Sequence, residues 1–353
     1  MNINIFAQDN IVKISTLQGA RFLFVLLIFL SHCSSPYITS PFDFGGECGV
    51  SFFFILSGFV LSFGYGPRVS RGEFRTRQFF WRHFMKLYPL HLLLFAIMLV
   101  LDWRIGNHYD WSQILTTLLL VQSWIPSNHT LYNINPVSWF LCDTLFFYLI
   151  FKYLYSFIIK MSWSKLIKLI TGFVVVYLIA AWHVPNNMIN CTLYANPLLR
   201  AFDFALGIVA YRYYKTADIS YIKNCTHNIG MLVISIGVGM TLYVVYQMLD
   251  GNGVRSVALF WPVMPVFIIC LATIDGTEDF LSRLLSSRLM VWLGNMSFEF
   301  FMVHSLVMRL LKHTMKTGVS IFSDYMFFGV ALCASILAAW VLNRCFTKMM
   351  LRK

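Results

Sequence analysis

About ten stretches of this chain are apolar over the length that an α-helix needs to cross a lipid bilayer, and no other feature constrains the fold as strongly. A spanning helix takes roughly 17 to 25 apolar residues, since the hydrocarbon layer is about 30 Å thick. In lipid, a helix satisfies its own backbone hydrogen bonds. The sequence therefore predicts an all-α, polytopic membrane helix bundle of one domain. The predicted spans are residues 17–33, 48–65, 87–103, 137–159, 166–183, 198–214, 228–249, 256–274, 289–311 and 322–342.

The composition agrees with a chain mostly dissolved in lipid. Hydrophobic residues make up 58% and charged residues 12%, against about 25% charge in soluble domains. This excludes an ordinary soluble enzyme and a disordered chain. The net charge of +12 is typical of basic cytoplasmic loops, and no basic soluble domain remains, so we expect no nucleic-acid partner. The eight cysteines form no CxxC pair, so neither a metal site nor a redox motif is predicted.

The distribution of Lys and Arg sets the predicted orientation. Residues 111–125 form a short apolar stretch, and counting it as a span would move the basic segment 152–168 outside. Treating it as an interfacial or re-entrant helix keeps most of the 27 Lys and Arg residues inside. We expect a multi-pass protein of the cell membrane, without a signal peptide. The predicted parts are a cytoplasmic segment over 1–16, the transmembrane domain over 17–343 and a basic cytoplasmic tail over 344–353.

Ionisable side chains inside predicted spans are the first candidates for function, because a charge in lipid is costly. Arg21 and His32 share the first span, and their spacing of eleven residues places both on one stripe of a helix, about 16 Å apart along its axis. A neutral imidazole there could act as a general base. The alternative is a snorkelling arginine and a hydrogen-bonded interfacial histidine.

The segment 45–65 is rich in small and aromatic residues around Ser57 and Gly58. Small residues let membrane helices pack closely, which accounts for most of this segment. An intramembrane serine protease is excluded, because its usual glycine two positions before the serine is Ile55 here. Ser57 stays a candidate for contact with a donor molecule.

Basic residues follow between 67 and 86, leading into the third span. Arg82 and Lys86 lie one helical turn apart, beside Tyr88, and could hold phosphates and an aromatic base. For the cations between Arg68 and Arg77 we expect contact with anionic membrane lipid.

Later spans contain further ionisable residues that could bind an acceptor. Arg200 and Asp203 are spaced i,i+3, so a structural ion pair is the alternative. Glu299 and His304 lie about 140° apart around their helix and need not touch, and Glu299 could instead bridge two helices. The predicted acceptor-binding residues are Trp139, Asp143, Arg200, Asp203, Glu299 and His304.

Six motifs in order give the chain a specific resemblance. They read RFLFVLLIFLSH, GVSFFFILSGF, WRHFMKLYP, SWFLCDTLFFYL, NPLLRAFDFALG and LGNMSFEFFMVH, from Arg21 to His304. This series resembles the acyltransferase-3 family of membrane-integral O-acyltransferases. The resemblance implies about ten spanning helices, an essential histidine at His32 with Arg21 in the same helix, a basic pair at Arg82 and Lys86, and a late histidine at His304.

The resemblance also implies a reaction. An acyl group, usually acetyl from acetyl-CoA, moves to a hydroxyl of a cell-envelope glycan or a related glycolipid. Three positions depart from the family's pattern. Ser51 occupies the position of an acidic residue, Thr144 that of a glutamate, with Asp143 adjacent, and Lys86 that of an arginine. They suggest a subgroup with its own acceptor.

The predicted mechanism uses acyl-CoA as co-substrate and no permanently bound cofactor. Arg82, Lys86 and Arg21 would hold its phosphates, and neutral His32 would take the proton of the attacking hydroxyl or carry the acyl group. Activity should then fall below roughly pH 6.5. The rival is a transporter or flippase for a polar lipid or oligosaccharide, whose path would use the same charges. An inactive partner subunit is disfavoured by the intact Arg21 and His32.

Overall fold

The computed structural model describes residues 13–33, 45–217, 253–316 and 324–347. These residues form helices and connecting loops with no strand among them, which confirms the all-α membrane bundle. The predicted span 228–249 and both chain ends, 1–12 and 348–353, lie outside the described residues.

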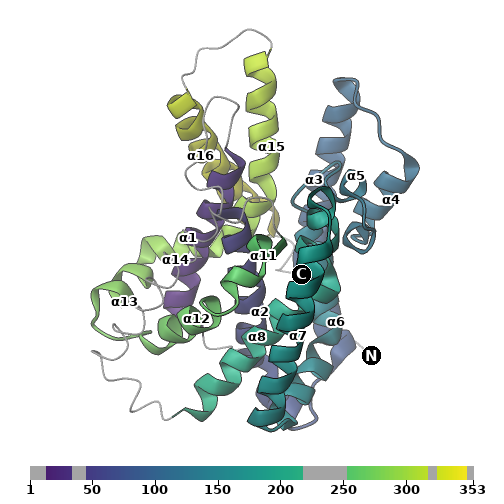
Figure 1. Ribbon diagram of the computed structural model, residues 1–353. Coiled ribbons are helices and arrows are strands. Elements are labelled where there is room, and N and C mark those ends of the chain that lie inside the picture. The colour runs from purple at the N-terminus through teal and green to yellow at the C-terminus, as the bar shows by residue number, and fades with distance from the viewer. Residues whose placement is uncertain (1–12, 34–44, 218–252, 317–323, 348–353) are drawn as a thin grey trace, which may run out of the picture.

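Eight longer helices make up the described bundle (Figure 1). Six of these regions are long and apolar enough to cross a membrane; the exceptions are α8 and α15, which carry the ionisable residues noted above. The eight are α1 (Ser15–His32), α2 (Gly45–Ser70), α3 (Thr76–Arg104), α6 (Trp139–Lys160), α7 (Trp163–His183), α8 (Pro197–Thr216), α15 (Ser297–Lys316) and α16 (Asp324–Val341).

Two predicted spans are interrupted. The stretch 256–274 divides into α11 (Gly253–Ser256), the short η4 (Ala258–Phe260) and α12 (Met264–Thr273). The stretch 289–311 divides at Met296 into α14 (Arg288–Asn295) and α15, with α13 (Phe280–Leu285) before them. Apolar composition alone therefore missed the breaks. A π-helical turn, η5 (Leu342–Thr347), continues α16.

The apolar stretch after α3 folds back as short helices. It contains α4 (Trp111–Leu118), η1 (Gln122–Trp124) and α5 (Asn128–Leu131). Eight residues of α4 reach about 12 Å, too short to cross the hydrocarbon layer, in agreement with the predicted interfacial helix. Two hydrogen bonds join it to α3: the Tyr88 hydroxyl donates to the Leu118 carbonyl at 3.1 Å, and His91 Nε2 lies 3.0 Å from the Thr117 carbonyl.

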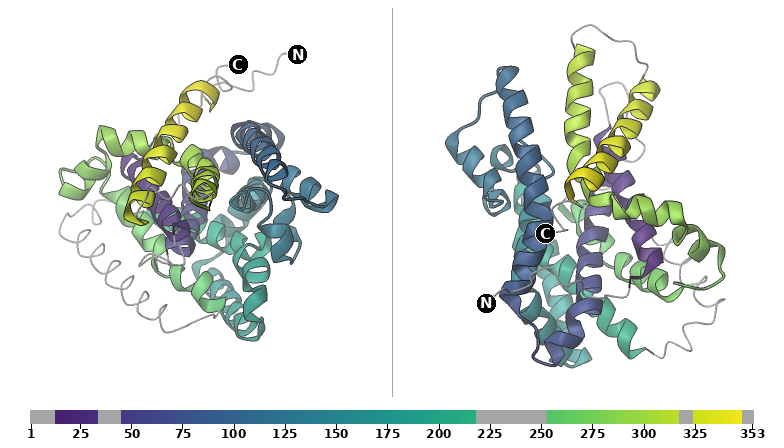
Figure 2. Two further views of the ribbon diagram at one scale, coloured as in Figure 1. Left: turned by 90° about the horizontal axis from the view of Figure 1, so that it is seen from above. Right: turned by 180° about the vertical axis from the view of Figure 1, so that it is seen from behind.

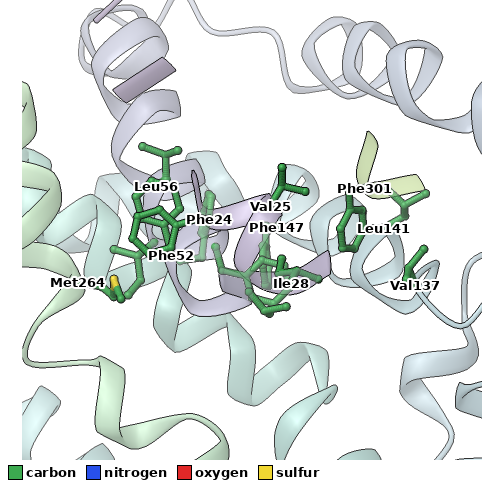
Figure 3. Packing of buried hydrophobic residues seen from close by; sticks show 14 of the residues in the cluster. Phe24, Val25, Ile28, Phe52, Leu56, Val137, Leu141, Phe147, Met264 and Phe301 are labelled. Carbon is green, nitrogen blue, oxygen red and sulfur yellow. The ribbon is translucent and has the colours of Figure 1, made fainter. Parts of the chain in front are cut away.

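Helix α2 packs between α1 and α8 near the middle of the bundle (Figure 2). Aromatic rings fill contacts between neighbouring helices: Phe24 of α1 stacks on Phe52 of α2 with centroids 3.7 Å apart, and Phe147 of α6 stacks on Phe204 of α8 at 5.0 Å. Figure 3 shows the α1 and α2 side chains interlocking in this core. These buried rings hold the helices against one another.

Glycines allow α2 and α8 to touch along their backbones. A Cβ atom at Gly207 would overlap the Ile55 carbonyl oxygen, and one at Gly58 would overlap the Phe204 carbonyl oxygen. Both obstacles are backbone, so neither can swing aside. These positions confirm the expected small-residue packing in the segment 45–65.

Gly207→Ala is expected to lower the free energy of unfolding by about 1–3 kcal/mol or more, because the added methyl group forces α8 away from α2. The measurement is the melting temperature of the detergent-solubilised protein. Gly172→Ala on α7 is the matched control, since a Cβ there meets nothing within 4 Å. Equal melting temperatures for the two variants would contradict the close α2–α8 contact.

Candidate functional site

The C-terminal end of α1 brings His32 against His304 of α15. His32 Nδ1 lies 3.2 Å from His304 Nε2, although 272 positions separate the two residues. His304 is buried, with 1% of its surface exposed, whereas His32 is exposed. Phe29 packs on Phe300 at 5.5 Å between centroids and holds the two helices together one turn below the pair. The two histidines thus form a pair in which His304 is buried and His32 is accessible.

A backbone carbonyl determines which ring nitrogen of each histidine carries a proton. His304 Nδ1 lies 2.6 Å from the Phe301 carbonyl oxygen, which can only accept, so this nitrogen is the donor. In neutral His304 the other nitrogen, Nε2, is then an acceptor, and His32 Nδ1 donates to it. Neutral His32 therefore keeps its basic lone pair on Nε2.

A cavity of about 490 Å³ opens above the histidine pair. Its walls come from the end of α1, the C-terminal ends of α3 and α15, and the loops that follow α3 and precede α6. In Figure 1 the ends of α3 and α15 stand at the same end of the molecule. The lining residues are His32, Asp102, Ile105, Asn107, Tyr109, Pro136, Val137, His304, Ser305, Met308, Arg309, Lys312 and His313.

An ion pair joins α3 to α15 across this cavity. Arg309 Nη1 bonds Asp102 Oδ2, and Arg309 Nη2 donates to the Ile134 carbonyl at 3.0 Å. The Tyr109 hydroxyl also donates to Asp102 Oδ2, at 2.6 Å. Burial, and then this hydrogen bond, raises the pKa of Tyr109 to about 12, so the phenol remains a donor at physiological pH.

A second cavity, of about 290 Å³, lies where α2 ends and α3 begins. Arg82, Arg68 and Arg75 line it with Glu73, Gln78 and the rings of Tyr65, Phe74 and Phe79. Along α3, Arg82 and Asp102 are twenty residues apart, so the two cavities lie about 30 Å from each other. That separation equals the thickness of a hydrocarbon layer.

The other predicted donor-binding residues are not gathered at this second cavity. Lys86 is exposed on α3, and Tyr88 faces α4 as described above. The Ser57 hydroxyl donates to the Phe53 carbonyl of its own helix at 2.7 Å. Of the predicted donor-binding residues, only Arg82 lines the second cavity.

Four of the predicted acceptor-binding residues form a separate buried cluster. Arg200 Nη1 pairs with Asp203 Oδ2 at 2.7 Å and donates to Ser51 Oγ at 3.2 Å, which confirms the i,i+3 ion pair. Trp261 Nε1 donates to Asp203 Oδ1 at 2.8 Å. Asp143 and Trp139 of α6 complete the cluster, in which Arg200, Asp143 and Asp203 are fully buried. None of these residues lines the cavity above His32.

Unused polar atoms remain in this cluster. Neither oxygen of Asp143 has a hydrogen-bond partner within 3.5 Å among the described residues, and the same holds for Arg200 Nε and Nη2. The Arg200 guanidinium instead lies over the rings of Tyr194, at 4.9 Å, and Phe54, at 5.2 Å. The positive charge of Arg200 acts on both buried carboxylates, Asp143 and Asp203.

Arg21 and Glu299 lie deeper in the bundle than His32. Arg21 Nη1 donates to Gln18 Oε1 at 3.3 Å, one turn earlier on α1. Asn343 Nδ2 donates to Glu299 Oε1 at 2.9 Å, so Glu299 bridges α15 and η5, which is the structural alternative that the sequence left open. Arg21 is not among the residues that line the cavity above His32.

Sequence reasoning missed Asp102, Tyr109 and Arg309. The signal was present, because Asp102 ends the third predicted span and Arg309 lies inside the ninth. Ionisable residues at such places call for partners. Nothing in the order of the residues indicates that these two partner each other across 207 positions.

Comparisons with known proteins identify the family of this chain. The sequence pattern of a family described as "Acyltransferase domain" matches residues 14–344. "Acyltransferase MdmB" from Streptomyces mycarofaciens is 26% identical over 325 residues, which cover 85% of this chain and 80% of that protein. No solved structure matches.

Proposed function

Since the chain belongs to the acyltransferase-3 family and is a multi-pass membrane acyltransferase, we propose that it moves an acetyl group from cytosolic acetyl-CoA to a hydroxyl of a cell-envelope or exported glycan. The observation that carries the proposal is the histidine pair: an exposed imidazole with its basic nitrogen fixed, on the floor of a cavity of about 490 Å³.

His32 is the general base in the proposed reaction. Its Nε2 takes the proton from the acceptor hydroxyl while the oxygen attacks the thioester carbonyl. The carbon–sulfur bond then breaks, and the CoA thiolate takes the proton from His32. The products are the ester and free CoA. His304 holds the His32 ring in the required tautomer and stabilises the transient imidazolium through its Nε2 lone pair.

The arginine-lined cavity at the start of α3 is the proposed site for the CoA phosphates. Arg82, Arg68 and Arg75 supply several donors for charge-assisted hydrogen bonds, and the aromatic residues beside them offer faces for the adenine. Arg68 and Arg75, which the sequence suggested for lipid contact, thus join Arg82. Arg21 lies between the two cavities along the bundle and would contact the donor beyond its phosphates.

The proposed orientation follows from this assignment. The arginine-lined cavity faces the cytoplasm, where acetyl-CoA is available, and the histidine cavity opens toward the outer side. Both termini are then cytoplasmic, as the positive-inside rule also favours. Trp139, Asp143, Arg200, Asp203 and Glu299 support the helices around this path in the proposal.

The test compares envelope glycans from cells that produce the wild type, His32→Ala or the empty vector, with matched amounts of the two proteins. Mass spectrometry and proton NMR of the glycans are expected to show one acyl-sized mass increment that only the wild type adds. Purified protein in nanodiscs, given labelled acetyl-CoA, should transfer the label to the same glycan.

Two outcomes would contradict the proposal. Identical acylation in all three strains would show that this protein does not acylate the glycan. Unchanged acylation combined with altered glycan export would favour the transporter instead. A transferred acyl group of another length would retain the acyltransferase and correct the donor.

A further inference from the structure

The Asp102–Arg309 pair stands beside the reaction centre proposed above. Arg309 follows His304 by five residues on α15, about 7.5 Å along the helix axis, and both residues line the same cavity as His32. A molecule bound in this cavity with its reacting hydroxyl at His32 can therefore also contact this ion pair.

Only one of the two carboxylate oxygens of Asp102 accepts hydrogen bonds from the described residues. Oδ2 accepts from Tyr109 and Arg309, while Oδ1 is buried and has no partner among the described residues. A buried carboxylate oxygen without a hydrogen-bond donor is energetically costly. The Asp102 side chain is 1% exposed, so bulk water does not relieve it. Asp102 is one of the residues that line the cavity, so a bound molecule that reaches this oxygen from the cavity side would meet an acceptor with no competing partner among the described residues.

Arg309 offers hydrogen-bond donors beside this acceptor. Its Nη1 and Nη2 each use a hydrogen for Asp102 and Ile134, a guanidinium has five N–H groups, and 26% of the side chain is exposed. An unused acceptor and available donors thus lie side by side in the cavity wall.

We propose that Asp102 and Arg309 form an acceptor subsite that binds a second hydroxyl, next to the one that is acylated. A hydroxyl both donates and accepts, so it matches an unused carboxylate oxygen beside guanidinium N–H groups. This inference rests on the proposed function and narrows its acceptor to a vicinal diol, such as a sugar ring supplies.

The charges at the subsite favour a neutral group over an acidic one. Asp102 balances the charge of Arg309, so this wall of the cavity has no net positive charge to attract a carboxylate or phosphate. Lys312 and His313 also line the cavity, one turn further along α15, and could attract an acidic group elsewhere on the acceptor. The experiment therefore includes an acidic probe.

The test measures CoA release from acetyl-CoA by purified protein in nanodiscs with simple alcohols as acceptors. The probes are cis-1,2-cyclohexanediol, cyclohexanol and cis-2-hydroxycyclohexanecarboxylate. The wild type is expected to prefer the diol to cyclohexanol in kcat/KM. Asp102→Asn should lower kcat/KM for the diol about 10- to 100-fold, through loss of a hydrogen bond to a charged group, and should affect cyclohexanol much less.

Asp110→Asn is the matched control, because it makes the same change at an exposed carboxylate eight residues later, in the loop that follows α3 and outside the cavity lining. Asparagine is also a good helix N-cap, so α4 keeps its start. If Asp102→Asn does not fold, Arg309→Lys replaces it: lysine keeps the charge but cannot bond both Asp102 and Ile134 as a fork, so the diol preference should again fall.

The outcomes separate this proposal from the proposed function. CoA release that needs His32 but is no faster with the diol than with cyclohexanol overturns the subsite and leaves the acyltransferase reaction intact. Preference for the carboxylate probe, retained in Asp102→Asn, overturns it as well and assigns recognition to an acidic group. Absence of any His32-dependent CoA release overturns both.

Discussion

His304→Leu is expected to lower the rate of acyl transfer about 10²- to 10⁴-fold, although His304 is buried and need not touch the acceptor. Leucine fills a similar volume but offers no lone pair. His32 Nδ1 then loses its hydrogen-bond acceptor, the ring is free to place its proton on either nitrogen, and the imidazolium formed during catalysis loses a stabilising contact. The effect should appear in kcat and less in KM for acetyl-CoA, since the arginine-lined cavity proposed for the CoA phosphates lies elsewhere.

A rescue experiment distinguishes this positioning role from a general loss of structure. His304→Gln retains a side-chain oxygen that can accept from His32 Nδ1, so it should recover part of the lost rate, whereas His304→Leu should not. His183→Leu, at the exposed end of α7, is the control for removing a histidine and should leave kcat unchanged. Equal rates for the leucine and glutamine variants at position 304 would contradict the assigned tautomers.

Arg200→Met is expected to lower the free energy of unfolding by about 3–5 kcal/mol. The substitution leaves Asp143 and Asp203 buried without a counter-charge and removes the guanidinium from its contacts with the Phe54 and Tyr194 rings. The measurement is the melting temperature in detergent, together with the yield of monodisperse protein.

Two comparisons isolate the cause of that loss. Arg212→Met, on the same helix, removes a half-buried arginine that donates to the Ile158 and Met161 carbonyls, and it should cost much less because it strands no carboxylate. Adding Asp143→Asn and Asp203→Asn to Arg200→Met removes the uncompensated charges and should restore most of the stability. If the triple variant is as unstable as Arg200→Met alone, lost packing rather than stranded charge explains the effect.

The sequence predicted the membrane bundle well, because a span of apolar residues is a local property. It also located helix positions for His32, Arg200 and Asp203, since spacing along one helix determines which side chains share a face. The Arg200–Asp203 pair is confirmed for this reason. Residues 228–249, predicted as a span, lie outside the described structure, so that prediction is untested.

Contacts between helices could not be predicted in the same way. The His32–His304 and Asp102–Arg309 contacts depend on how α1, α3 and α15 pack, and no spacing along the chain encodes that packing. The basic segment 67–86, which lies between two predicted spans, is also mostly helix, because α2 continues to Ser70 and α3 starts at Thr76. Hydropathy identifies the part of a helix that lies in lipid, whereas charged residues can extend the same helix beyond it. Arg68, Arg75 and Arg82 come together through this extension.

Helix α3 contributes lining residues to both cavities, so one continuous helix of 29 residues connects them. Pro89 lies within it, between the two walls, and a proline inside a helix removes a backbone hydrogen bond and allows bending there. A ligand that tilts or bends α3 at one cavity would change the shape of the other cavity. Thermodynamic linkage requires such an influence to run equally in both directions, so in the proposed arrangement binding at one cavity would change the affinity at the other.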